Sequence, residues 1–204
     1  MQGKIFNCAD DAEREEGMNI AVKAAQSGRL VVMPTDTLYG LGCDAFDNDA
    51  VANLLATKQR GPDMPVPVLV GSWVTIQGLV REFTDTAQTL VEAFWPGGLS
   101  IVVPEAPSLP WNLGDTRGTV LLRMPLQSVA IELLREVGPM AVSSANISGQ
   151  PPATRAGEIG QLLRNLIDNA RSFSPAGGIV RVVLSGADNE ARILIEDDGP
   201  GVPS

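Results

Sequence analysis

The chain has 204 residues, of which 44% are hydrophobic and 19% charged, and this composition predicts a soluble protein with a substantial core. It contains no histidine, which excludes Ser-His-Asp and Cys-His nucleophilic catalysis, histidine-ligated zinc and histidine as a general base. What remains is carboxylate, lysine or tyrosine chemistry, or catalysis by positioning and charge stabilisation, on which phosphoryl and nucleotidyl transfer largely depend.

The formal net charge of −9 argues against a broad nucleic-acid-binding surface but leaves room for a local basic cleft. Cys8 and Cys43 lack the spacing of metal ligands and fit a reducing compartment. No apolar run approaches the length of a membrane span, and the first residues lack the basic-then-apolar order of a signal peptide. The sequence therefore predicts a cytoplasmic protein with no membrane association.

The first predicted elements are an amphipathic helix over residues 9–28 and a buried strand over residues 30–33, which Pro34 ends. The polar side chains that follow this strand belong to Thr35, Asp36, Thr37 and Tyr39. Strand ends in α/β sheets present ligand-binding groups. A polar turn, whose side chains satisfy the backbone, explains the same residues, and composition alone favours the turn.

A helix is predicted over residues 47–57, and two cations, Lys58 and Arg60, follow at its end. Cations are favourable at a helix C-terminus because they complement the helix dipole. The same pair would serve as a clamp for phosphate groups in the cleft that contains Thr35. On these residues alone, the pairing with the helix end is the favoured interpretation.

Further strands are predicted over residues 66–71 and 99–103, separated by a helix over 84–94. Pro67 indicates that the first of these strands lies at a sheet edge or starts irregularly. Ser100 lies early in the second strand.

A strand over residues 119–122 follows, with Arg123 at its carboxyl end, where an anion-binding arginine and a solvated surface arginine are about equally favoured. A helix over 128–137 and a strand over 140–142 come next. The residues after that last strand include Ser143, Ser144 and Asn146. Such neutral donors suit the phosphates or ribose of a nucleotide, and a serine or Asx turn explains them equally well.

Together these pieces resemble the YrdC-type threonylcarbamoyl-AMP synthase family over residues 1–156. The matching stretches are PTDTLYGLG (34–42), KQR (58–60) with MPVPVLV (64–70), FWPGGLS (94–100), LLRMP (121–125) and SSANISGQPPAT (143–154). The resemblance implies an α/β fold, a twisted mixed open sheet with flanking helices and a concave cleft. It also implies a nucleotidyltransferase, which forms threonylcarbamoyl-AMP and pyrophosphate from L-threonine, bicarbonate and ATP for tRNA t6A37 modification.

Residue roles follow from the resemblance at matching positions. L-threonine would contact Thr35, Tyr39 and Arg123. Lys58 and Arg60 would be the catalytic cations on the ATP phosphates, helped by Mg²⁺ rather than by a metal site of the protein. The remaining ATP-binding positions are Ser100, Ser144, Asn146 and, with a weaker match, Ser143. The product would pass to a tRNA threonylcarbamoyl transferase, and direct binding of tRNA or double-stranded RNA is not expected.

Residues 157–204 depart from that family, because its later Ser-Thr-aliphatic-Asp and Leu-Arg-x-Gly segments are not complete here. Residues 158–202 instead resemble part of a sensor histidine kinase ATP-binding domain, from its N-box to its G1 box. The matching positions are Asn165 and Asn169 on a predicted helix and Asp197, Gly199 and Gly201 after a predicted hairpin. The alternative function is therefore a chimera, packed or appended at its C-terminal part, that is catalytically impaired or binds nucleotide at most.

Overall fold

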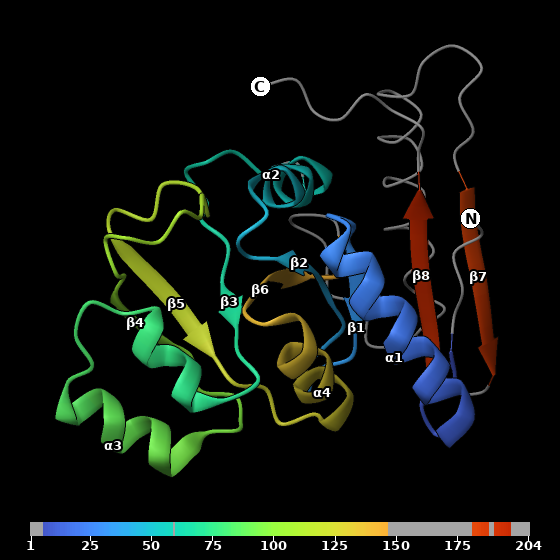
Figure 1. Cartoon of the computed structure of the whole chain (residues 1–204), viewed down its shortest axis with the longest axis horizontal. Helices are drawn as coiled ribbons and strands as arrows, with labels where there is room; N and C mark the ends of the chain where they lie inside the picture. The colour runs from blue at the N-terminus through green and yellow to red at the C-terminus, as the bar shows by residue number, and fades with distance from the viewer. Residues whose placement is uncertain (1–5, 59, 147–180, 188–189, 197–204) are drawn as a thin grey trace.

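The computed structural model describes residues 6–58, 60–146, 181–187 and 190–196, and for the last two ranges only the strands (Figure 1). The helices are α1 Asp11–Gln26, α2 Asn48–Thr57, α3 Asp85–Phe94 and α4 Ser128–Val137, with a 3-10 helix, η1, at Trp73–Gly78. The strands are β1 Val31–Met33, β2 Gly40–Asp44, β3 Val68–Leu69, β4 Ile101–Pro104, β5 Thr119–Arg123, β6 Met140–Ser144, β7 Arg181–Ala187 and β8 Glu190–Glu196.

Six strands form one open sheet in the order β1-β2-β6-β3-β5-β4. Only β3 and β5 pair in parallel, and the other neighbours in this sheet are antiparallel. The mixed open sheet with flanking helices that the sequence predicts is thus confirmed. The order places β1 and β4 at the two edges and β6 between β2 and β3, so that residues far apart in the sequence meet on neighbouring strands.

The four predicted α-helices are confirmed within two residues at each end, because local capping signals mark their starts. The side chains of Asp10, Asp47 and Thr84 each accept a hydrogen bond from a backbone N–H in the first turn of the helix that follows. The chain turns away after α1 at Gly28, whose φ is +73°. Within the described ranges, no helix combines the length and the apolar character that crossing a bilayer requires.

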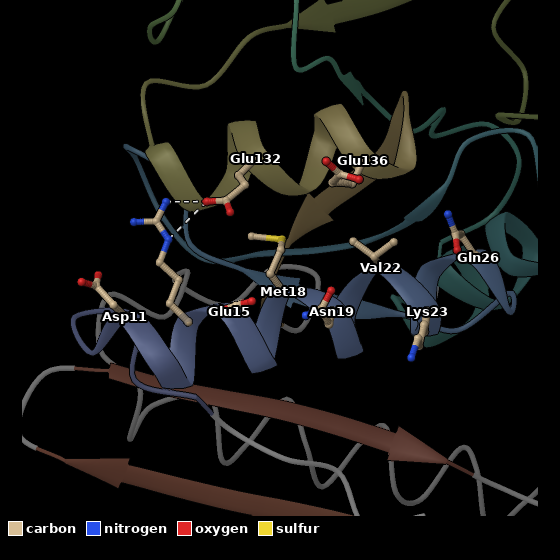
Figure 2. A pocket seen from close by; sticks show the side chains of 10 residues that line it. Asp11, Glu15, Met18, Asn19, Val22, Lys23, Gln26, Glu132 and Glu136 are labelled. Atoms are coloured by element: carbon tan, nitrogen blue, oxygen red, sulfur yellow. Dashed lines mark hydrogen bonds and ion pairs between the residues drawn. The ribbon is translucent and has the colours of Figure 1, made fainter.

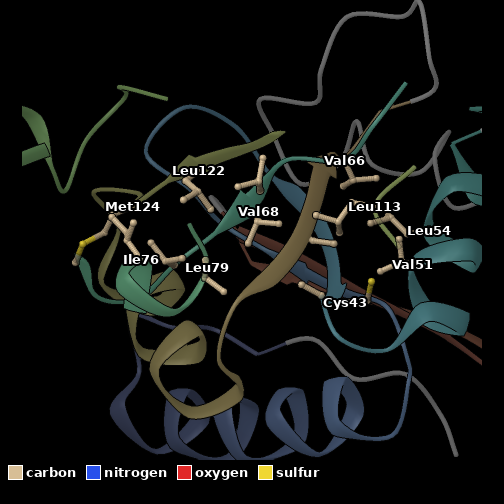
Figure 3. Close-up of a cluster of buried hydrophobic side chains, with 14 of the residues drawn as sticks. Cys43, Val51, Leu54, Val66, Val68, Ile76, Leu79, Leu113, Leu122 and Met124 are labelled. Carbon is tan, nitrogen blue, oxygen red and sulfur yellow. The ribbon is translucent and has the colours of Figure 1, made fainter. Parts of the chain in front are cut away.

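Two hydrophobic clusters lie on opposite faces of the sheet, because successive strand residues point to opposite sides. On β6, Ala141 belongs to one cluster, and its neighbours Met140 and Val142 belong to the other. Helices α1 and α4 cover the face of Met140 (Figure 1), where Arg14 of α1 and Glu132 of α4 form an ion pair at 2.5 Å. Figure 3 shows the other cluster, to which α2, η1 and β3 contribute side chains such as Leu54, Ile76 and Val68.

Strand β2 is the main element that the sequence interpretation missed. Its residues lie in the stretch interpreted as a polar loop after β1, partly because glycine has low strand propensity. Gly40 is paired with Ser144, and a Cβ atom at Gly40 would lie 2.7 Å from Cγ1 of Val142. The glycine is therefore required by close packing within the sheet, and β2 and β6 could not pair in this way with a larger residue there.

Strand β3 corrects a second expectation. It is not an edge strand, since it lies between β6 and β5, and only the irregular start suggested by Pro67 is consistent with its two-residue length. The proline still contributes to the sheet, because its carbonyl accepts a hydrogen bond from the N–H of Val142 at 2.9 Å. A residue without an N–H is tolerated where its carbonyl supplies the contact.

The predicted C-terminal hairpin is confirmed as β7 and β8, which pair antiparallel from Arg181 opposite Glu196 to Ala187 opposite Glu190. Among the described residues these two strands form their own sheet, and β8 lies beside β1. The predicted kinase-like positions Asn165, Asn169, Asp197, Gly199 and Gly201 lie outside the described residues, as does the predicted helix that would contain the first two.

Gly71 and Gly78 give a matched test of the packing between β3 and α4. A Cβ atom at the buried Gly71 would lie 2.8 Å from the backbone nitrogen of Arg135, whereas nothing lies within 4 Å of a Cβ atom at the exposed Gly78. We expect Gly71→Ala to lower the free energy of unfolding by about 1–3 kcal/mol, because the backbone of α4 must move. Urea denaturation measures this loss.

Gly78→Ala is the control, and its free energy of unfolding is expected to stay within about 1 kcal/mol of the wild type, on the stabilising side. Equal losses in the two variants would contradict the close approach of Gly71 to α4.

Candidate functional site

The loop between β1 and β2 is held together by the hydroxyl of Thr35. This hydroxyl donates to the carbonyl of Leu38 at 2.5 Å and accepts from the N–H groups of Leu38 at 3.2 Å and Thr37 at 3.3 Å. The hydroxyls of Thr35 and Thr37 lie 3.2 Å apart. Thr35 therefore makes the contacts of the polar-turn interpretation, and a role in binding L-threonine stays a prediction.

Arg123 lies at the carboxyl end of β5, as predicted, and its guanidinium is 15% exposed. Three of its N–H groups are used by other segments. Nε donates to the carbonyl of Gly97 at 3.0 Å, Nη1 to the hydroxyl of Thr37 at 3.2 Å, and Nη2 to Oδ1 of Asp36 at 2.7 Å. Since a guanidinium has five N–H donors, two remain, one on each terminal nitrogen, among the residues that the structure describes.

Asp36 is the residue of this site that sequence reasoning did not assign. Its Oδ1 also accepts from the N–H of Leu126 at 3.0 Å, so the carboxylate joins the loop after β1 to the segment that follows β5. The local sequence around Asp36 suits a turn and contains no sign of its partner, because Arg123 lies 87 residues further along the chain. Only the strand order brings the two together.

Ser100 lies at the same end of the sheet as Arg123. Ile101 pairs with Leu122 across β4 and β5, so the residue before Ile101 lies level with the residue after Leu122. Ser100 is exposed and precedes β4 instead of lying within a strand. Its hydroxyl is therefore accessible near the guanidinium, as its predicted role requires.

A second group of predicted residues surrounds the ammonium of Lys58, whose residue is 1% exposed. Nζ donates to the carbonyl of Ser144 at 2.6 Å, to Oδ1 of Asn146 at 2.9 Å and to the carbonyl of Asn146. The Ser144 hydroxyl donates to the same Oδ1 at 2.5 Å. The three N–H bonds of a charged ammonium match three oxygens here, so Lys58 organises the predicted nucleotide-binding segment.

Burial, with the nearby positive charge of Arg60, lowers the pKa of Lys58 to about 8. Both causes disfavour the charged ammonium, because it loses hydration and meets a like charge. At pH 7 the side chain is still mostly protonated, in agreement with its three oxygen acceptors. The electrostatic effect also places the charge of Arg60 near that of Lys58, as predicted for a pair of cations acting on one ligand.

Ser143 and Ser144 point to opposite faces of the sheet. Ser143 pairs with Leu41 and Ser144 with Gly40, and consecutive strand residues alternate in direction. Ser143 is 5% exposed, and its hydroxyl has no hydrogen-bond partner among the described residues. The structure therefore does not bring Ser143 together with the group around Lys58, and its predicted role remains untested.

Strand β2 connects the two groups. Its first residue, Gly40, pairs with Ser144, and the preceding carbonyl, of Tyr39, accepts from the N–H of Ala145 at 2.8 Å. Tyr39 is partly buried against the core, next to the loop that contacts Arg123. A guanidinium, a buried ammonium and several neutral donors thus lie along one continuous path, which is an arrangement suited to binding anions.

A groove between α1 and α4, of about 460 Å³, shares no residue with these two groups (Figure 2). Met18 and Val22 contribute its apolar part, and its charged residues are Asp11, Glu15, Glu132, Glu136, Arg14 and Lys23. Four carboxylates against two cations disfavour an anionic substrate there. Among the described residues, no group of three or more Asp, Glu, Cys or His side chains could hold a metal ion.

Comparison with known proteins gives a match to the Sua5, YciO and YrdC family model, described as telomere recombination, over residues 23–183. A Mycobacterium leprae protein, provisionally named a threonylcarbamoyl-AMP synthase, is 55% identical over 202 residues, which cover 93% of this chain and 92% of the relative. The threonylcarbamoyl-AMP synthase of Pyrococcus abyssi is 36% identical over 77% of this chain, and the match spans 46% of that longer protein.

Solved structures give the same grouping. P. abyssi Sua5 complexed with L-threonine matches with a TM-score of 0.69 and 35% identity, over 72% of this chain and 44% of that one. Escherichia coli YciO matches with a TM-score of 0.66 over 74% of each chain, and its 24% identity supports the fold alone. On the strength of the match over residues 23–183 and of these relatives, the chain belongs to the Sua5/YciO/YrdC family.

Proposed function

We propose that this chain is a threonylcarbamoyl-AMP synthase, which forms threonylcarbamoyl-AMP and pyrophosphate from L-threonine, bicarbonate and ATP. The names of the M. leprae and P. abyssi relatives and of a Bacillus subtilis relative, 35% identical over 85% of this chain, support this activity. The observation that carries the proposal is Arg123, a shielded guanidinium with two N–H donors available beside the loop of Thr35 and Asp36.

In the proposed reaction, the amine of L-threonine and bicarbonate combine to a carbamate with loss of water. A carbamate oxygen then attacks the α-phosphorus of ATP, and pyrophosphate leaves. Little in this sequence of steps needs a side chain tuned as a general base, so a chain without histidine can catalyse it by alignment and charge neutralisation. Arg123 would hold the threonine carboxylate in bidentate fashion.

The remaining predicted residues receive roles that fit their positions. Thr35 and Tyr39 would line the threonine end, and Lys58 and Arg60 would neutralise charge on the phosphates. Ser100, Ser144 and Asn146 would hold the nucleotide, and Ser143 has the weakest claim because its hydroxyl points to the other face. Mg²⁺ would arrive with ATP and be held chiefly by phosphate oxygens, since the described residues offer no metal-binding group. The product would pass to a tRNA threonylcarbamoyl transferase.

The first test is pyrophosphate release from ATP, measured with and without L-threonine and bicarbonate. We expect release that requires both. Arg123→Ala is expected to raise the KM for L-threonine by about 100-fold or more, while the KM for ATP changes less than about threefold. Arg81→Ala, which removes an exposed arginine that contributes only a backbone contact to the fold, is the control.

An equal loss for both substrates in Arg123→Ala would contradict the assigned role. A wild-type chain that releases no pyrophosphate, while ATP or L-threonine still raises its melting temperature, would support the alternative of an inactive chain that only binds.

The second test uses the lowered pKa of Lys58. ATP binds the charged ammonium, and the free protein loses that charge as the pH rises through about 8, so binding must then take up a proton. The dissociation constant of ATP is expected to rise above that pH by up to about tenfold per pH unit. Calorimetric titration with ATP at several pH values measures it.

Lys58→Arg is the control, because a guanidinium does not titrate in this range. Its melting temperature shows whether it folds. A folded Lys58→Arg protein with the same pH profile as the wild type would mean that Lys58 does not control ATP affinity.

For the C-terminal part, we propose that residues 157–204 form a unit separate from residues 1–156, with kinase-like sequence over 158–202. The separate pairing of β7 with β8 supports this division. Limited proteolysis is expected to cut near residues 150–157 and leave a stable N-terminal fragment. Resistance of the whole chain would mean that the C-terminal part is packed into the fold, and would contradict the division.

A further inference from the structure

We propose that Asp36 is a positioning residue for L-threonine, because it holds the guanidinium of Arg123 in the orientation that leaves a bidentate site open. This inference rests on the proposed function and deepens it, since it concerns the recognition of one substrate at the same site. The observation behind it is the contact between Oδ1 of Asp36 and Nη2 of Arg123 at 2.7 Å.

The fixed orientation of the guanidinium depends on contacts from two sides. The carbonyl of Gly97 holds Nε from the turn before β4, and Thr37 and Asp36 hold the two terminal nitrogens from the loop after β1. Each contact uses one N–H, and the remaining pair, one on each terminal nitrogen, is the number that a carboxylate takes in a bidentate pairing. The arginine is therefore preorganised before the substrate arrives.

Asp36 is the charged member of these contacts and is itself well placed to be rigid. Its side chain is 17% exposed, and the same Oδ1 accepts from the N–H of Leu126 at 3.0 Å. The carboxylate thus cannot follow the arginine without giving up a backbone contact on the segment after β5. Thr37, in contrast, meets Arg123 with a longer and uncharged contact of 3.2 Å.

Without the charge of Asp36, the long arginine side chain would sample more rotamers, and binding of the substrate would have to order it. The effect is specific to the carboxylate of L-threonine, because Lys58 and Arg60 lie in the other group of residues, on the far side of β2 and β6. Asp36 therefore affects the affinity for L-threonine and not that for ATP.

The test compares Asp36→Asn with the wild-type protein. Asparagine retains an oxygen for the N–H of Leu126 and removes only the charge. We expect the dissociation constant of L-threonine, measured by calorimetry, and its KM to rise about tenfold. The KM for ATP is expected to change less than about twofold and the melting temperature less than about 2 °C. Glu82→Gln, the same change at an exposed position outside the site, is the control and should change none of these values.

A double-mutant cycle shows whether Asp36 acts through Arg123. In an Arg123→Ala background, Asp36→Asn is expected to change the affinity for L-threonine less than about twofold. A further tenfold loss in that background would overturn the proposal, and so would unchanged affinity in the single variant. A parallel rise in both KM values with a falling melting temperature would assign Asp36 a merely structural role and overturn it as well.

The outcome for Asp36 can be separated from that for the proposed activity. A wild-type chain that binds L-threonine and releases no pyrophosphate overturns the synthase activity alone, and the calorimetric cycle then decides the role of Asp36. A wild-type chain that does not bind L-threonine overturns both.

Discussion

The antiparallel pairing of β2 with β6 is the interaction on which the candidate site depends. It sets Gly40 beside Ser144 and Tyr39 beside Ala145, and so joins the loop that contacts Arg123 to the segment that surrounds Lys58. This pairing requires a residue without a Cβ atom at Gly40, because Val142 fills the space above it. A larger residue there would separate two groups of side chains whose proposed substrates must react with each other.

The two cations of the site are held in different ways, and this difference fits different tasks. Arg123 keeps its charge at any ordinary pH and has N–H donors to offer, so it suits recognition of a carboxylate. Lys58 is buried, its pKa is lowered to about 8, and its ammonium already contacts carbonyls of Ser144 and Asn146. A phosphate could reach that ammonium only by replacing one of these oxygens, so Lys58 links the conformation of this segment to nucleotide binding.

Helices and most strands could be predicted from the sequence because their signals are local. Caps such as Asp47 and Thr84 and the short apolar runs of β4, β5 and β6 need no knowledge of the rest of the chain. Strand β2 could not, since its glycines favour a loop until Val142 lies against them. The same limit applies to the site. Candidate residues could be named, but the pairs Asp36–Arg123 and Lys58–Asn146, 87 and 88 residues apart, exist only through the strand order.

The overall acidity of the chain makes the local grouping of cations more important. A net charge of −9 repels ATP at long range, so electrostatic attraction must come from a few cations where carboxylates are few. The groove between α1 and α4, rich in carboxylates, cannot provide it, whereas the region around Lys58, Arg60 and Arg123 can. Within that region Asp36 is the exception, and its one negative charge is directed at Arg123 alone. We infer that a carboxylate is retained there because the loss in attraction is smaller than the gain from a guanidinium with a fixed direction.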